Sequence, residues 1–485
     1  MNRFWTMASG LFLAVLCGCA PPEPAGPTGV WQAEPEFQGA AGRVVLEILE
    51  DEEGQLGARL GMPDLGVHGL AMGPATLQGS ELQAGPFRLT FDPAAGTLKG
   101  DLPEALVPVH RIAATFRRVA SAAPVPEQEP EAPPLEPAWT YDAGAAIWGG
   151  VAADDSGVYF GDDSGMVRSL DLDGTERWRF AAEGAVRGRP SFAGDDLLVL
   201  SDDGRLYRLD RSNGETVWVA EVEAPRTRIA YGESGYRYDH QSAAPVIAAG
   251  AIYLGTASGA LLALDAASGR IRWQFEAGDS ITGNAAVADG VVCFGSFDGF
   301  VYALDTADGA LRWKVDTGAP VPSSPAIHDG LAIVGSRSYD LFGLALEDGA
   351  IRWRSYLWFS WIESSVIIDG GAAYLGSSDA QLLQAFDPSS GARRWSADTG
   401  GSAWATPAVD GEVVYIGTAG VAGYMVDHRA RFLALDREQG RVLGAFSLEP
   451  RGDEPVWGFS SSPAAARGRV FVGGLDGRLY AFDRP

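Results

Sequence analysis

The chain has 485 residues, of which 46% are hydrophobic, 21% charged and 10% aromatic, so it holds enough apolar material for a folded core and is not a disordered chain. Its formal net charge of −26, from 37 basic and 63 acidic residues, argues against electrostatic binding of nucleic acid or of an anionic lipid surface. The 63 glycines follow no Gly-X-Y period and therefore indicate many tight turns.

Residues 1–19 have the pattern of an export signal. Arg3 is basic, an apolar run extends from Leu11 to Leu16, and that run is too short for a permanent membrane span. The end of the segment, Leu16-Cys17-Gly18-Cys19, resembles the lipobox of bacterial lipoproteins. The resemblance implies that Cys19 carries the acyl chains and, since Ala20 is not aspartate, that the protein is sorted to the outer membrane. An ordinary cleaved signal with two incidental cysteines is the alternative.

Residues 28–119, after a Pro/Gly tether at 20–27, alternate apolar and polar residues with a period of two. The polar turn Asp51-Glu52-Glu53-Gly54 separates two such segments and predicts a β-hairpin. We expect a small antiparallel β-barrel, and Thr28-Gly29-Val30-Trp31 and Met62-Pro63-Asp64-Leu65-Gly66 make it similar to a lipocalin-like domain. Its interior holds either an apolar ligand or, as in most barrels of this size, its own side chains. Residues 120–138 contain six prolines and four glutamates and predict a solvated linker.

A repeat of about 40 residues occupies 139–485 and predicts a β-propeller with four-stranded blades. Each unit contains a Leu-Asp position followed, in most units, by a tryptophan. The eight Leu-Asp positions are Asp171, Asp210, Asp265, Asp305, Glu347, Asp387, Asp436 and Asp483. The tryptophan is replaced by Gly444 in the seventh unit, so seven blades are the alternative to eight.

The two ends of the repeat region complement each other. The chain stops just before its last tryptophan strand, and the region begins at Ala138-Trp139-Thr140-Tyr141, which has the pattern of that missing strand. We therefore expect the Trp139 strand to complete the last blade and close the ring, which hides exposed sheet edges.

The repeat resembles the family named for pyrroloquinoline quinone, on motifs such as Gly299-Phe300-Val301-Tyr302-Ala303-Leu304-Asp305 and the Trp313–Gly318 segment. The resemblance implies an all-β, eight-bladed fold that both quinone enzymes and non-catalytic scaffolds use. The chain lacks the adjacent cysteine pair of the quinone enzymes, and its five histidines show no metal-binding spacing. We expect the aspartates to form turns, no cofactor and no metal site; pyrroloquinoline quinone with Ca²⁺ belongs only to the alternative of a dehydrogenase.

The long loops are predicted to lie on one face of the ring, because strand direction alternates within each blade. The connections before blades 3, 6 and 8 and one loop of blade 7 are expanded and rich in Tyr, Trp and Arg, residue types that dominate binding hot spots. Packing of these aromatics against their own loops is the alternative. The candidate binding face comprises Tyr236, Arg237, Tyr238, Tyr356, Leu357, Trp358, Phe359, Trp361, Tyr424 and Trp457.

Four residues at matching repeat positions, Trp148, Arg187, Glu363 and Trp404, are candidates for a small-molecule pocket at the mouth of the central channel. An Arg/Glu pair that satisfies itself is the alternative.

These features together resemble the propeller lipoprotein of the outer-membrane β-barrel assembly machine, although that lipoprotein lacks the added barrel. We expect a lipid-anchored scaffold of the cell envelope, facing the periplasm, that binds envelope proteins through one propeller face. The alternative is an enzyme or sensor that binds a quinone or a sugar at the channel mouth.

Overall fold

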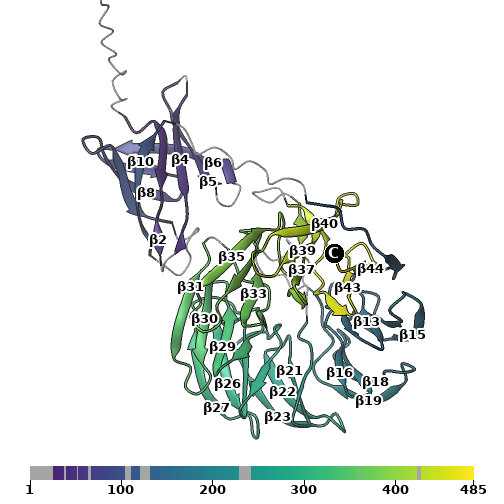
Figure 1. Cartoon of the computed structure of the whole chain (residues 1–485). Coiled ribbons are helices and arrows are strands. Elements are labelled where there is room, and N and C mark those ends of the chain that lie inside the picture. Colours follow the sequence, from purple (N-terminus) through teal and green to yellow (C-terminus); the bar gives the residue numbers. More distant parts are fainter. Residues whose placement is uncertain are drawn as a thin grey trace, which may run out of the picture.

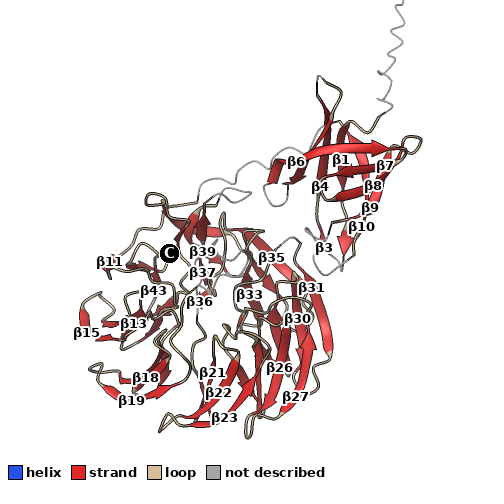
Figure 2. Ribbon diagram, turned by 180° about the vertical axis from the view of Figure 1, so that it is seen from behind, coloured by secondary structure: helices blue, strands red, loops and turns tan. Residues whose placement is uncertain are grey.

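The computed structural model describes residues 26–485 except 38–39, 52, 64–66, 104–110, 121–131, 229–241, 359 and 423–427. The described residues form a closed eight-stranded antiparallel barrel and a ring of eight four-stranded sheets, so the expected all-β fold class is confirmed. Figure 1 shows the barrel beside the ring, and Figure 2 shows the same two bodies from behind. The export signal, with its candidate lipidation residue Cys19, lies outside the described residues.

The barrel has the strand order β1-β10-β9-β8-β7-β6-β5-β4. Its strands are β1 (Gly29–Ala33), β4 (Val44–Glu50), β5 (Leu56–Met62), β6 (Val67–Gln78), β7 (Glu81–Ala84), β8 (Phe87–Asp92), β9 (Thr97–Asp101) and β10 (Ala113–Val119). Inward residues alternate with outward ones, and Trp31, Phe87 and Phe116 fill the interior together with aliphatic side chains. A short hairpin of β2 (Glu36–Phe37) and β3 (Ala40–Ala41) projects between β1 and β4.

The eight blades each contain four antiparallel strands, and the first strands of several adjacent blades contact one another around the central channel. Blades 1 to 4 are formed by β12 (Ala152–Asp154), β13 (Gly157–Gly161), β14 (Met166–Leu170), β15 (Glu176–Ala181); β16 (Ser191–Ala193), β17 (Asp196–Leu200), β18 (Arg205–Asp210), β19 (Thr216–Glu221); β20 (Val246–Ala248), β21 (Ala251–Gly255), β22 (Ala260–Asp265), β23 (Ile271–Glu276); β24 (Ala286–Ala288), β25 (Val291–Gly295), β26 (Phe300–Asp305) and β27 (Leu311–Asp316).

Blades 5 to 8 repeat this arrangement. Their strands are β28 (Ala326–His328), β29 (Leu331–Gly335), β30 (Asp340–Ala345), β31 (Ile351–Tyr356); β32 (Ile367–Asp369), β33 (Ala372–Gly376), β34 (Leu382–Phe386), β35 (Arg393–Asp398); β36 (Ala408–Asp410), β37 (Val413–Gly417), β39 (Ala430–Asp436), β40 (Val442–Leu448); and β42 (Ala464–Ala466), β43 (Arg469–Gly473), β44 (Arg478–Asp483) with β11 (Trp139–Asp142). β11 pairs with β44, with Trp139 opposite Ala481, so the first strand of the repeat region completes the last blade.

The recurring tryptophan fastens each blade to the next. Trp313 of β27 donates its indole N–H to the carbonyl of Leu346 at 2.9 Å, and its ring covers Gly349 in the next blade. Gly349 has a φ of +74°, and a Cβ there would lie 2.9 Å from the ring, so both the turn and the stacking require glycine. The same indole-to-carbonyl bond to the following blade is made by Trp139, Trp178, Trp273, Trp353 and Trp395.

Blade 7 is a complete blade although it has Gly444 in place of the tryptophan, so the count is eight. Leu135 from the linker fills the vacated position, because a Cβ on Gly444 would lie 2.6 Å from its side chain. Leu135 N donates to Ala445 O at 2.8 Å and Ala445 N donates to Pro133 O at 2.9 Å, and these backbone bonds hold the linker against β40. The end of the linker therefore differs from the expected solvated segment, since Leu135 is buried between blades 7 and 8.

One of the eight predicted Leu-Asp positions, Glu347 in blade 5, is wrong. Ala345, and not Glu347, pairs with the first residue of its neighbouring strand as Asp305 does in blade 4. The prediction chose Glu347 because it is acidic, but strand pairing shows that blade 5 has an alanine, and no carboxylate, at the Leu-Asp position.

The barrel docks on blades 5 and 6 through its β2–β3 hairpin, which lies next to β31 in both views (Figures 1 and 2). Phe37 meets Tyr356 edge-to-face with ring centroids 5.2 Å apart. Trp358 covers Gly42, where a Cβ would lie 3.1 Å from the indole ring. Tyr339 and Tyr356 are thus part of the same apolar cluster as the barrel interior.

Candidate functional site

The described parts of the expanded connections lie on one face of the ring, which we call the loop face. In blade 1, the turn between the second and third strands bonds to the connection that leaves the blade, with Ala182 N donating to Gly165 O at 2.9 Å. Val222 N repeats this bond to Gly204 O in blade 2. These two classes of connection therefore share a face, as strand parity predicts.

Two of the four expansions pair with each other to form a ribbon on the loop face. β38 (Ala419–Val421), from the loop of blade 7, runs antiparallel to β41 (Val456–Gly458), from the connection before blade 8. Trp457 lies opposite Gly420, where a Cβ would be 2.2 Å from the indole ring. Trp457 is therefore half-buried against its own ribbon, which fixes the ribbon's position.

The candidate aromatic residues of blades 5 and 6 contact the chain's own barrel. Tyr356 and Leu357 are buried, with 4% and 6% of their surface exposed, and Trp358 packs against the barrel cluster. Trp361 lies over the guanidinium of Arg337, whose Cζ is 4.8 Å from the ring centroid. Five members of the candidate face lie outside the described residues: Tyr236, Arg237, Tyr238, Phe359 and Tyr424.

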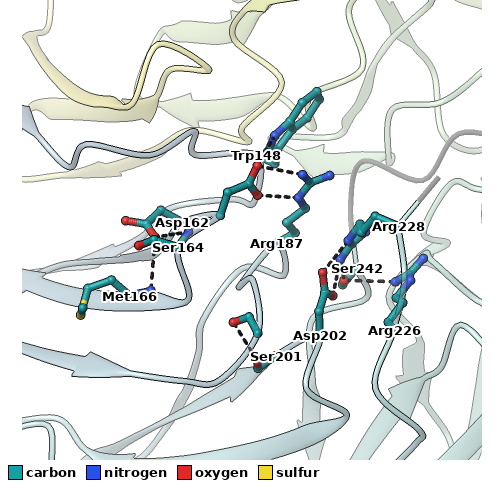
Figure 3. A network of polar contacts seen from close by, with 12 residues as sticks. Trp148, Asp162, Ser164, Met166, Arg187, Ser201, Asp202, Arg226, Arg228 and Ser242 are labelled. Carbon is teal, nitrogen blue, oxygen red and sulfur yellow. Dashed lines mark hydrogen bonds and ion pairs between the residues drawn. The ribbon is translucent and has the colours of Figure 1, made fainter. Parts of the chain in front are cut away.

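At the channel mouth, Trp148 and Arg187 converge on Asp163 (Figure 3). Arg187 binds the Asp163 carboxylate through two nitrogens, at 2.6 and 2.8 Å, and Trp148 donates its indole N–H to the same carboxylate at 3.1 Å. The Arg187 guanidinium also lies 4.9 Å from the Trp148 ring centroid. Such a bidentate, stacked arginine is held rigidly.

Glu363 and Trp404 have other partners than the sequence suggests. Glu363 pairs with Arg337 at 2.6 Å, both side chains being 5% exposed, so the acid does not pair with Arg187. Trp404 donates to Ser378 Oγ at 3.1 Å and packs beneath the β38–β41 ribbon. Of the four candidates, Arg187 and Glu363 line the channel cavity.

Sequence reasoning missed a second arginine–aspartate pair next to the mouth. Arg228 contacts Asp202 through two nitrogens at 2.6 and 2.7 Å and also donates to Ser242 (Figure 3). Arg226 N-η1 lies 3.3 Å from the same hydroxyl. Asp163 and Asp202 hold the same place in equivalent turns of adjacent blades, and the sequence signal for the second pair was the arginines in the insertion before blade 3.

The aspartates at the Leu-Asp positions cap turns, as their regular recurrence predicts. Asp265 accepts the backbone N–H and the hydroxyl of Ser268 and a 2.6 Å bond from Arg272. These donors, Arg272 foremost, lower the pKa of Asp265 to about 2. Asp305 with Arg312 and Asp387 with Arg394 repeat the pair.

The described residues contain no group of three or more His, Cys, Asp or Glu side chains placed to hold a metal ion. In the same part of the chain, no helix has the length and apolarity needed to cross a membrane.

Comparison with known proteins decides the family. The family model described as outer membrane protein assembly factor BamB matches residues 136–300 and 297–485, which together span the entire propeller. The chain belongs to this family.

Relatives of the BamB family match this chain over part of their length. The outer membrane protein assembly factor BamB of Yersinia pestis is 30% identical over 131 residues, which are 27% of this chain and 31% of that protein. The chain thus spans about a third of the length of this curated relative.

Solved structures show the same fold. BamB from Moraxella catarrhalis superposes with a TM-score of 0.55 at 19% identity, covering 72% of this chain and 97% of that one. The quinohemoprotein alcohol dehydrogenase of Comamonas testosteroni gives a TM-score of 0.53 at 14% identity, covering 72% and 76%. At these identities the likeness shows the propeller alone, and it does not distinguish a scaffold from an enzyme.

Proposed function

We propose that this chain is a lipid-anchored scaffold of outer-membrane protein assembly that binds envelope proteins through its loop face, on the periplasmic side of the outer membrane. The family match over the whole propeller carries this proposal. The relatives named above are described as outer membrane protein assembly factors, and the lipobox resemblance of residues 16–19 supplies an anchor.

The loop face is the surface that can vary in this fold, because every other connection is a short turn. The β38–β41 ribbon lies there, together with residues 222–228, 242–245, 357–358 and 360–366. Trp358 and its neighbours bind the barrel, so we assign partner binding to the loop face of blades 7 and 8. Arg451, an exposed residue of the connection before β41, marks this region.

Photo-crosslinking in intact cells tests the face. A photoreactive amino acid at Arg451 should capture a protein of the outer-membrane assembly pathway. The matched control is Asp289, an exposed turn residue on the opposite face, where we expect no such product. Equal capture from both positions, or capture from Asp289 alone, would contradict the assignment.

The anchor and the scaffold role have separate tests. Cys19→Ala should release the protein from membranes into the soluble envelope fraction, whereas persistent membrane association would refute lipidation at Cys19. Deleting the chain should lower the amount of folded β-barrel protein in the outer membrane. Dye-linked alcohol oxidation after adding pyrroloquinoline quinone and Ca²⁺ would instead favour the dehydrogenase alternative.

A further inference from the structure

A ring of eight equivalent residues surrounds the central channel just before the first strand of every blade. Each ring residue stands two positions ahead of that strand, and a proline follows it in five blades, which keeps the backbone extended. The ring consists of Gly150, Arg189, Ala244, Asn284, Ser324, Ser365, Thr406 and Ser462. All eight are described, and all eight line one cavity of about 270 Å³.

Side chains of this ring bond to the backbone of their neighbours and form a belt. Asn284 Oδ1 accepts from Ala244 N at 2.6 Å, and Ser324 Oγ accepts from Asn284 N at 2.8 Å. Ser365 Oγ accepts from Ser324 N at 3.0 Å, and Ser462 Oγ accepts from Thr406 N at 3.0 Å. The belt fixes neutral amide and hydroxyl groups around one side of the cavity.

Arg189 is the one charged member of the ring. Its two neighbours are Gly150 and Ala244, which offer no polar side chain, and its stem lies against Gly150, where a Cβ would be 3.0 Å away. No group of the described chain is bonded to or paired with its guanidinium, whereas Arg187 at the mouth is satisfied by Asp163. The Arg189 side chain is exposed to the channel, so its guanidinium is accessible to a ligand in the cavity, and it remains charged at neutral pH.

No described side chain neutralises this guanidinium, so the cavity carries a positive charge that an entering anion can bind. The opposite side of the ring, four blades away, carries Ser365, so a ligand can bind Arg189 at one end and hydroxyls at the other. Val246 and Ile367 add apolar surface to the lining. A cavity of about 270 Å³ lies below the range of drug-sized sites, which limits the ligand to a compact molecule.

We propose that the propeller channel is a binding site for a small oxyanion, a carboxylate or phosphate group on a compact polar molecule, held by Arg189 and the ring of neutral hydrogen-bonding groups. This site is independent of the loop-face scaffold role. Arginine suits this task because its planar donors bind two oxygens of a carboxylate or phosphate at once.

The test compares the full-length chain with Arg189→Gln and with Arg88→Gln, which removes an exposed charge from the outside of the barrel. Thermal melting and calorimetric titration are run with inorganic phosphate, and separately with acetate, against chloride at equal ionic strength. We expect at least one oxyanion to bind and to raise the melting temperature of the wild type and of Arg88→Gln. Affinity should fall at least tenfold in Arg189→Gln. The two arms identify which oxyanion the site prefers.

Stability without the ligand gives an independent readout. In chloride alone, Arg189→Gln should melt at about the wild-type temperature, because the guanidinium makes no bond within the described chain that the variant would break. A variant that melts lower in chloride would show that Arg189 is structural and would overturn the proposal. Equal oxyanion affinity in both proteins, or binding of neither oxyanion, would overturn it as well. If Arg189→Gln does not fold, the arginine Nε–H resonances of the wild type decide: one must shift with saturable oxyanion binding, and none shifting refutes the site.

Discussion

At the residue scale, Tyr339 departs from the repeat because it packs in the cluster that joins the propeller to the barrel. The equivalent turn position is Gly165, Gly204, Gly259 or Gly299 in blades 1 to 4, and all five residues have a positive φ, +70° for Tyr339. A non-glycine residue costs about 1 kcal/mol or more in this conformation. Tyr339 instead contributes a ring 6.1 Å from that of Tyr356, within the cluster that joins the barrel.

The lowered pKa of Asp265 predicts how the stability of the protein changes at acidic pH. Its folded pKa of about 2 lies below the usual value for an aspartate, so its contribution to stability is present above pH 4 and is lost as the pH falls toward 2. Replacing Arg272 with glutamine should raise the pKa of Asp265 toward 4, as followed by carboxyl NMR titration. The acid-induced fall in melting temperature should then begin at higher pH.

Blade 5 supplies the matched control for this prediction. Arg352 holds the position of Arg272, but the facing residue is Ala345 where other blades carry aspartate. Arg352→Gln should therefore leave the acid limb of the stability curve unchanged. If both variants shifted that limb equally, the effect would belong to overall charge and not to the Asp265 pair.

At the scale of elements, Leu135 belongs to the linker, outside the repeat, and takes the place of a strand residue of blade 7. Its side chain occupies the tryptophan position of blade 7, and it is 9% exposed. Leu135→Ala should reduce the free energy of unfolding of the propeller by about 2–3 kcal/mol, because it leaves a cavity between blades 7 and 8. Urea unfolding followed by tryptophan fluorescence measures this change.

Leu311→Ala is the comparison for Leu135, since it removes the same atoms from an outer strand where the side chain is 47% exposed. We expect a loss within about 0.5 kcal/mol there. Similar losses in the two variants would mean that the linker does not stabilise blade 7.

The features that recur from one repeat to the next could be predicted from the sequence. Trp139, Trp313 and the turn aspartates recur at fixed intervals because every blade faces the same packing problem, and the barrel follows from period-two alternation. Leu135 could not be predicted, since comparison of repeats reveals that Gly444 lacks a tryptophan but not which distant residue replaces it. The channel ring was missed for a related reason: Arg189 is exceptional only once the start of each first strand is known.

The same limit applies to the aromatic residues of blades 5 and 6. The sequence alone indicates that the blade fold does not require a side chain as large as that of Trp358, because Gly318 holds the matching position in the preceding repeat. What it contacts was not predictable from that departure, since an aromatic surface for the chain's own barrel and one for another protein have the same composition. Only the placement of Phe37 and Gly42 distinguishes them.

At the scale of the whole molecule, the barrel is joined to the propeller by the linker and, among the described residues, by the aromatic cluster that contains Tyr356 and Trp358. Trp358→Ala removes the half-buried ring that covers Gly42, and truncating a partly buried tryptophan costs about 2–3 kcal/mol. Because the barrel remains tethered, its docking equilibrium should fall roughly a hundredfold while both domains stay folded. We expect the radius of gyration in small-angle X-ray scattering to increase, with the melting temperature of the propeller unchanged.

Trp457→Ala is the control, because it removes a side chain of the same size from the β38–β41 ribbon and should leave the scattering profile unchanged. An unchanged profile for Trp358→Ala would show that the barrel is held by other contacts, and would return the aromatic surface of blades 5 and 6 to the set available for partner proteins.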